Sequence, residues 1–214
     1  GDVVQAWREH DALLSEKCEI LNKYQFTELH YENEAGTDFR VGLVKNHIWE
    51  GGSEESGSGV RFIANMPTEE VFTMPDYRKA EGKVVSSRPL SYRGNLIKDF
   101  SLTFHEGKVV DFDAREGYDA LKQLLDTDEG SKSLGEVALV PYASPISEMG
   151  ILFYNTLFDE NASCHLALGE CYPTTVQDGE KMNEEELHQI GGNHSLNHVD
   201  FMIGTKEMKI TGIT

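Results

Sequence analysis

Residues 90–114, LSYRGNLIKDFSLTFHEGKVVDFDA, decide the fold class of this chain. Apolar, aromatic and β-branched residues fall in three short runs, which are typical of strands. The predicted strands are 90–92, 96–104 and 109–114. Both connections, YRGN at 92–95 and HEGK at 105–108, have turn composition, with glycine in the third position. Strands joined by such short turns form hairpins, so this stretch predicts a sheet with mainly antiparallel pairing.

Helical and strand patterns flank these hairpins. Residues 2–22 repeat apolar side chains at helical spacing, which predicts a helix with Asp2 as its N-cap. Helical spacing returns at 115–126, and Asn183 with Glu186 forms a capping box at the start of another helix. The remaining predicted elements are strands at 26–31, 38–48, 83–87 and 137–140 and a flexible Gly- and Ser-rich loop at 51–59. Together they predict one α+β domain, residues 1–214, with a mainly antiparallel sheet and flanking helices.

The composition is that of a globular and strongly acidic protein. The 214 residues include 39% hydrophobic residues, enough for a substantial core, and carry a formal net charge of −18. This charge repels nucleic-acid phosphates and anionic membrane surfaces, and we expect neither as a partner. The three cysteines show no Cys-x-x-Cys spacing, which favours reduced thiols and a cytoplasmic location.

Residues 198–204, HVDFMIG, combine a strand pattern with two metal-binding types of side chain. Alternate residues of a strand share a face, so His198 and Asp200 point to one side, with Val199 and Phe201 opposite. An imidazole and a carboxylate side by side on a strand are two ligands of a divalent-metal site. A surface ion pair is the alternative.

Other acids and a histidine also interrupt apolar surroundings. Glu136 heads the run LGEVALV at 134–140. A metal would neutralise a carboxylate buried there, and an exposed strand end is the alternative. His165 lies in CHLALG at 164–169, where a hydrogen-bonded core histidine is the alternative to a ligand. Glu160 alone is typical of a solvated loop acid.

Glu69 and Glu70 are adjacent carboxylates in PTEEVFT, residues 67–73. Adjacent carboxylates can divide two tasks, because one can bind a metal while its neighbour moves protons. Two surface acids, in a chain with 37 acidic residues, are the alternative.

These segments together resemble the thermophilic metallo-aminopeptidase family, of the aminopeptidase T and aminopeptidase S type. The motifs occur in the same order along nearly the whole chain: NMPTEEVFT at 65–73, SRPLSY at 87–92, LGEVALVP at 134–141, SPIS at 144–147, LFDENASCH at 157–165 and HVDFMIG at 198–204. The chain resembles the C-terminal catalytic portion of the family, and we expect the family's N-terminal α/β domain to be absent from it.

The resemblance implies a metal-dependent aminopeptidase that acts on peptides with a free N-terminus. It implies two divalent ions, which could be zinc, cobalt, manganese or magnesium, and a homodimer in the full-length protein. The implied metal ligands are Glu70, Glu136, Glu160, His165, His198 and Asp200. Glu69 is the implied general base, although the alignment leaves open which of Glu69 and Glu70 is the ligand. Tyr172, in GECYP at 169–173, matches an active-site tyrosine.

Two other functions stay open. A non-catalytic metal-binding domain, or a remnant of such an enzyme, is the first, and the completeness of the six candidate ligands argues against it. A two-metal phosphatase is the second. The charge of −18 and the absence of phosphate-cradling Gly or Arg clusters argue against that function.

Overall fold

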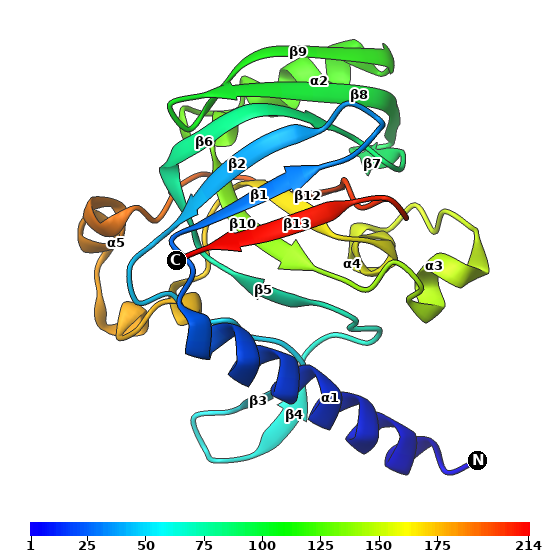
Figure 1. Ribbon diagram of the computed structural model, residues 1–214, viewed down its shortest axis with the longest axis vertical. Helices are drawn as coiled ribbons and strands as arrows, with labels where there is room; N and C mark the ends of the chain where they lie inside the picture. Colours follow the sequence, from blue (N-terminus) through cyan, green and yellow to red (C-terminus); the bar gives the residue numbers. More distant parts are fainter.

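The computed structural model, which describes residues 1–214, contains two antiparallel sheets and a separate hairpin (Figure 1). The larger sheet has seven strands, with β9 (Lys108–Glu116) paired to β8 and the others in the order β13 (Lys209–Ile213), β1 (Glu28–Glu32), β2 (Asp38–Leu43), β6 (Pro75–Val85), β8 (Asn95–His105) and β7 (Leu90–Tyr92). The smaller sheet has the order β12 (His198–Met202), β11 (His165–Gly169), β10 (Leu134–Leu139) and β5 (Val71–Thr73). The hairpin is β3 (Ser53–Glu55) with β4 (Arg61–Ile63).

Five α-helices surround the sheets. The long helix α1 (Val3–Tyr24) contacts β5, and α2 (Tyr118–Leu125) packs on β8 and β9. Three short helices are α3 (Pro145–Met149), α4 (Thr156–Asp159) and α5 (Glu184–Ile190). Figure 1 shows β13, the last strand of the chain, beside β1, the first. None of the helices has the length and apolarity needed to cross a bilayer.

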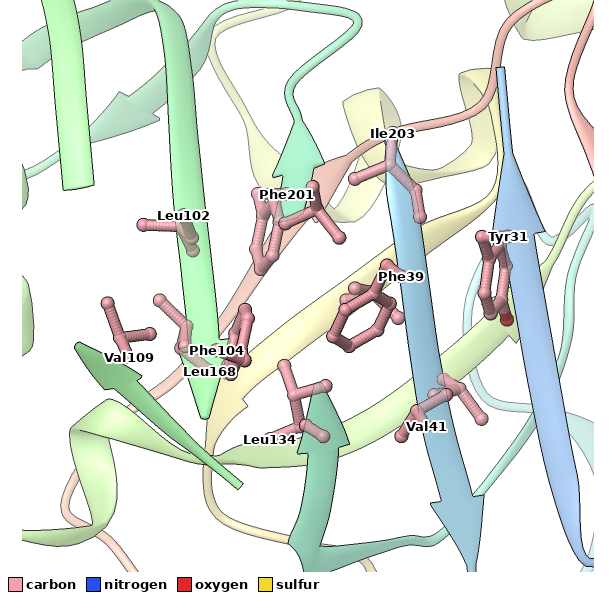
Figure 2. Packing of buried hydrophobic residues seen from close by; sticks show 14 of the residues in the cluster. Tyr31, Phe39, Val41, Leu102, Phe104, Val109, Leu134, Leu168, Phe201 and Ile203 are labelled. Carbon is pink, nitrogen blue, oxygen red and sulfur yellow. The ribbon is translucent and has the colours of Figure 1, made fainter. Parts of the chain in front are cut away.

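One hydrophobic core lies between the two sheets. Tyr31 and Phe39 of the larger sheet share it with Leu168 and Phe201 of the smaller sheet (Figure 2). All five residues of β11 are buried, on both of its faces. Only one of these faces belongs to the core, so the other face of the smaller sheet encloses a second, polar interior.

The structure confirms most of the predicted elements. The N-terminal helix has Asp2 as its N-cap, and the capping box of Asn183 and Glu186 opens α5. The three predicted strands of 90–114 are β7, β8 and β9. The α+β class with mainly antiparallel pairing is therefore correct.

Several boundaries differ, among them the start of the strand predicted at 83–87, which begins at Pro75, and three of the differences have local reasons. The strand predicted at 38–48 ends at Leu43, because the chain turns at Asn46, whose φ is +60°. The loop predicted at 51–59 contains β3, because Asp11 of α1 accepts hydrogen bonds from the amide and hydroxyl of Ser53. The helix predicted at 115–126 starts only at Tyr118, since β9 continues to Glu116.

Candidate metal centre

Four of the six predicted ligands lie on one face of strands β10, β11 and β12. Glu136 is the direct partner of Ala167, and Ala167 is in turn the partner of Asp200. Direct partners in an antiparallel pair point to the same face, as do residues two positions apart on one strand. The same rule adds His165, two residues before Ala167, and His198, two residues before Asp200.

Glu70 reaches this face from the start of β5. Phe72 is the direct partner of Ala138, which shares the face of Glu136, and Glu70 precedes Phe72 by two residues. The Oε2 atom of Glu70 lies 2.8 Å from Nε2 of His165, which places its carboxylate among the others. The convergence of these side chains is thus a consequence of strand register.

A β-bulge at Gly135 directs Glu136 to the polar face. The register with β11 shifts between Leu134 and Glu136, so that β10 uses two residues for one step of its partner. Leu134 therefore packs in the core while Glu136 points away from it. Only glycine fits at position 135, because a Cβ atom there would lie 2.0 Å from the carbonyl oxygen of Glu170.

Glu136 belongs to two clusters of potential ligand atoms. We name Glu70, Glu136 and His165 the first ligand group, and Glu136, His198 and Asp200 the second ligand group. Within each group the ligand atoms lie within 4.8 Å of one another. Oε1 of Glu136 is 3.5 Å from Nε2 of His165, and its Oε2 is 3.7 Å from Nε2 of His198. A carboxylate with one oxygen toward each group has the geometry of a bridging ligand.

Both imidazoles present the same nitrogen to this space. Nδ1 of His165 lies 3.1 Å from the carbonyl oxygen of Ser163, and Nδ1 of His198 lies 2.8 Å from that of Glu170. Since a carbonyl oxygen only accepts, Nδ1 carries the proton and donates it in each ring. In the neutral ring Nε2 then keeps its lone pair for a metal, and the backbone contact fixes the tautomer and orientation.

Two buried atoms of the first ligand group have no hydrogen-bond partner: Oε2 of Glu70 and Nε2 of His165. They lie close together but are not aligned as donor and acceptor. Glu70 is 8% exposed and His165 is fully buried. Buried polar atoms without partners are uncommon and costly. A divalent cation, which accepts both carboxylate oxygen and imidazole nitrogen as ligands, accounts for both atoms.

Two buried carboxyl groups of the site, Glu136 and Glu160, have raised pKa values. Burial raises the pKa of Glu136 to about 7, and the nearby charges of Asp200 and Glu70 act in the same direction. Burial also raises the pKa of Glu160 to about 9, again with a contribution from Asp200 and Glu70. Crowded carboxylates need positive charge to stay ionised, and a metal ion supplies it.

The pKa values of His165 and His198 are raised and that of Asp200 is lowered, because these groups carry opposite charges and lie close together. Burial alone would lower the pKa of His198, but the carboxylates of Asp200 and Glu136 and the carbonyl oxygen of Glu170 together outweigh it and raise the pKa to about 9. Burial would also lower the pKa of His165, yet the carboxylates of Glu136 and Glu70 hold it well above its ordinary value. Burial favours the neutral form of Asp200, but His198, His165 and Glu160 together outweigh it and lower the pKa of that carboxyl.

Glu160 and Tyr172 lie beside the two ligand groups. Glu160 begins a 3-10 helix (Glu160–Ala162), is 5% exposed and interacts with Asp200, but it is part of neither group. The ring of Tyr172 lies 4.7 Å from that of His198 and 6.1 Å from that of Phe72, measured between centroids. Burial raises the pKa of the Tyr172 hydroxyl, with the charges of nearby acids acting in the same direction, so the hydroxyl stays protonated and can donate.

Glu69 faces α1 and lies outside both ligand groups. Its Oε2 atom is 3.6 Å from Nε2 of His10, and its backbone N–H donates to Oδ1 of Asn161. Burial raises the pKa of its carboxyl group, partly offset by His10. Of the two adjacent acids, Glu70 is therefore the one whose carboxylate joins the cluster.

Sequence reasoning missed the residues that keep this face open. Ala138 and Ala167 are fully buried on the polar side of the smaller sheet, between the strands that carry the ligands. Their small side chains leave the space above the sheet to the ligand groups. The alternation of small and apolar residues along β10 and β11 is the sequence signal for this open face.

The comparisons with known proteins show the family of this chain. The sequence matches the family model described as thermophilic metalloprotease (M29) over residues 1–214. This chain belongs to that family. Within the thermophilic metalloprotease family, the chain is 54% identical to aminopeptidase 2 of Geobacillus stearothermophilus over 213 residues. The match covers 100% of this chain and 51% of the relative.

A second relative matches over a similar range of the chain. Aminopeptidase T of Thermus thermophilus is 43% identical over 212 residues, which are 99% of this chain and 51% of the relative. The chain thus spans about half the length of the curated relatives it matches. The structure of wild-type AmpT from Thermus thermophilus superposes with a TM-score of 0.92 at 44% identity, covering 99% of this chain and 52% of AmpT.

A more distant structure shares the fold alone. The 2,5-dihydroxypyridine dioxygenase from Pseudomonas putida KT2440 has a TM-score of 0.60 at 17% identity, over 95% of this chain and 55% of that one. At this level of identity, the similarity describes the scaffold and not the chemistry.

Proposed function

We propose that this thermophilic metalloprotease chain carries the active site of a metal-dependent aminopeptidase. One observation carries the proposal: the two oxygens of the buried Glu136 face two separate ligand groups, each with its own histidine. The relatives named aminopeptidases support the reaction class.

Two divalent ions would be held here, with Glu136 contributing to both ligand groups. Charge supports this number, because two doubly charged cations balance the four carboxylates of Glu70, Glu136, Glu160 and Asp200. Carboxylate and imidazole ligands suit zinc, cobalt, manganese and magnesium, and affinity alone does not choose among them. Bound between these ligands, such ions supply a water of lowered pKa and a Lewis acid for the scissile carbonyl.

The protein's own residues position the reaction. His165 and His198 keep Nε2 directed at the site through their backbone contacts. The hydroxyl of Tyr172 donates a hydrogen bond to the oxyanion that develops during attack, an effect of about 3 kcal/mol in comparable sites. Glu69 serves as the general base that carries the proton to the leaving amine, and Glu69→Gln is the variant that tests it.

The substrate is a peptide with a free N-terminus. The relatives named aminopeptidases support this class of substrate. Nucleic acid and anionic membranes remain disfavoured by the net charge of −18.

For the whole protein we propose a homodimer in the cytoplasm. The resemblance to the family is the basis for the dimer. The cysteines Cys18, Cys164 and Cys171 are all free in the structure, which supports a reducing compartment. Light scattering of the full-length protein measures the oligomeric state.

The test combines metal content with hydrolysis. The chain is treated with a chelator, restored with zinc, cobalt, manganese or magnesium, and assayed on amino-acid anilides and on their N-acetylated forms. We expect two ions per chain by elemental analysis, cleavage of the free substrates alone, and loss of both metal and activity in Glu136→Gln. Two bound ions without hydrolysis would instead support the non-catalytic metal-binding domain.

A further inference from the structure

Two of the six candidate ligands lie outside the paired strands themselves. Four lie on β10, β11 and β12, where sheet hydrogen bonds fix the backbone. Glu70 lies just before β5, and Glu160 begins a one-turn 3-10 helix. Neither segment has the regular backbone hydrogen bonding of a sheet, so other contacts must fix these two carboxylates relative to each other.

The side chain of Asn161 makes these contacts. It is 1% exposed, and its Oδ1 accepts a hydrogen bond from the backbone N–H of Glu69 at 2.7 Å. Its Nδ2 donates to the carbonyl oxygens of Leu157 at 2.9 Å and Pro67 at 3.4 Å. One buried amide therefore joins the segment before Glu70 to the segment that carries Glu160.

The backbone of Asn161 is held as well. The hydroxyl of Ser144, at the N-cap of α3, donates to the carbonyl oxygen of Asn161 at 2.7 Å. Ser144 is 2% exposed, so water does not compete for this hydrogen bond. Ser144 thus holds the backbone of Asn161, while the side-chain amide of Asn161 bonds to the backbone of Glu69.

We infer that Asn161 is a positioning residue that fixes Glu70 relative to Glu160 and thereby controls the metal position of the first ligand group. This inference rests on the proposed function, since it concerns the two-metal site proposed above. Removing the amide leaves the N–H of Glu69 and the carbonyl oxygens of Leu157 and Pro67 without that partner, which releases the segment before Glu70. The second ligand group keeps its strand register and is affected less.

Asn193 provides a matched control. It is 3% exposed, and its Nδ2 donates to the carbonyl oxygens of Gly130, Ser133 and Gly169 at 2.8, 3.3 and 2.6 Å. Like Asn161, it is a buried amide that bonds to backbone in distant segments. It makes no hydrogen bond to the segments that carry Glu70 and Glu160.

Calorimetric titration with zinc of the chelator-treated full chain tests the inference. We expect two binding steps in the wild type, and Glu70→Gln identifies the step that depends on the first ligand group. Asn161→Ala should weaken that same step by about 10- to 100-fold, the range typical of residues that orient metal ligands. The other step should change by less than about 3-fold, and Asn193→Ala should keep the Glu70-dependent step.

The possible outcomes are distinct. Equal weakening of both steps in Asn161→Ala, or loss of the Glu70-dependent step in Asn193→Ala as well, would show a general structural role and overturn the inference. If Asn161→Ala does not fold, Ser144→Ala removes only the anchor of Asn161 and should weaken the same step to a smaller extent; an unchanged step there overturns the inference. A wild-type chain that binds no zinc contradicts the proposed function itself.

Discussion

Glu136 and Ala167 face each other across strands β10 and β11, on the side of the smaller sheet that points away from the core. Asp200 is the partner of Ala167 on its other side. The methyl group of Ala167, on the central strand β11, therefore lies between the positions of the two carboxylates Glu136 and Asp200. The small side chain keeps open the space that the second ligand group surrounds.

Filling this space should remove the metal centre without unfolding the protein. Ala167→Leu adds three carbon atoms to the floor of the site, and we expect zinc affinity to fall by about 100-fold or more. The cost in stability should be about 1–3 kcal/mol, as for other overpacked positions. Zinc titration and urea denaturation measure the two effects. Ala114→Leu, at a buried position on β9 of the other sheet, should cost similar stability and leave zinc affinity unchanged.

The bulge at Gly135 should be intolerant of any side chain. A Cβ atom there would lie 2.0 Å from the carbonyl oxygen of Glu170 and 2.4 Å from that of Gly169, and backbone atoms cannot move aside freely. We expect Gly135→Ala to lower the free energy of unfolding by about 3 kcal/mol or more. Gly57→Ala, where no atom lies within 4 Å of the added Cβ, should be nearly neutral. Equal stability of the two variants in urea would contradict this account of the bulge.

Several elements that the sequence predicted well have local contacts, although the local hairpin of β3 and β4 was not predicted. The hairpins of 90–114 form from neighbouring residues, and the α1 cap at Asp2 needs only its own first turn. By contrast, β5 and β13 were missed. Each is short, and each finds its partner far away in the sequence, β5 on β10 and β13 on β1.

The identity of the ligands could be predicted, but their arrangement could not. Each candidate was named through its motif, without knowledge of which strands pair. The common face depends on the register of three strand pairs and on the bulge at Gly135, since simple alternation along β10 would have put Leu134 and Glu136 on one side. The hydrogen bond from the N–H of Glu69 to Asn161 joins residues 92 positions apart, so no local sequence pattern indicates it.

Asp128 should make stability depend on pH in the acid range. Its Oδ1 accepts from the hydroxyls of Ser131 and Ser195, and its Oδ2 accepts from the N–H of Leu196. Burial acts in the opposite direction, but these hydrogen bonds outweigh it and lower the pKa of Asp128 from 3.8 to about 2. A carboxyl whose pKa is lowered by folding stabilises the protein above its unfolded pKa and loses that effect as the pH falls toward its folded pKa.

We therefore expect Asp128→Asn to lower the free energy of unfolding by about 1–3 kcal/mol at pH 7. The difference from the wild type should shrink as the pH falls from about 4 to about 2, because the wild-type carboxyl then loses its advantage. Urea denaturation of the chelator-treated proteins at several pH values measures it. Asp111→Asn, an exposed position on β9, should show no such trend. A difference that stayed constant down to pH 2 would mean that the Asp128 charge is not responsible.

Tyr172 should act on the reaction and not on metal binding. Tyr172 is 45% exposed, and its ring packs near that of His198. Tyr172 belongs to neither ligand group. Tyr172→Phe keeps the ring and removes the donor, so we expect kcat on amino-acid anilides to fall by about 100-fold, with KM and zinc content nearly unchanged. Tyr118→Phe is the matched control, because Tyr118 is 44% exposed and stacks on Phe112 outside the site. A loss of zinc in Tyr172→Phe would assign Tyr172 to metal binding. An unchanged kcat would exclude Tyr172 from stabilising the transition state, because a donor to the oxyanion contributes only when that charge develops.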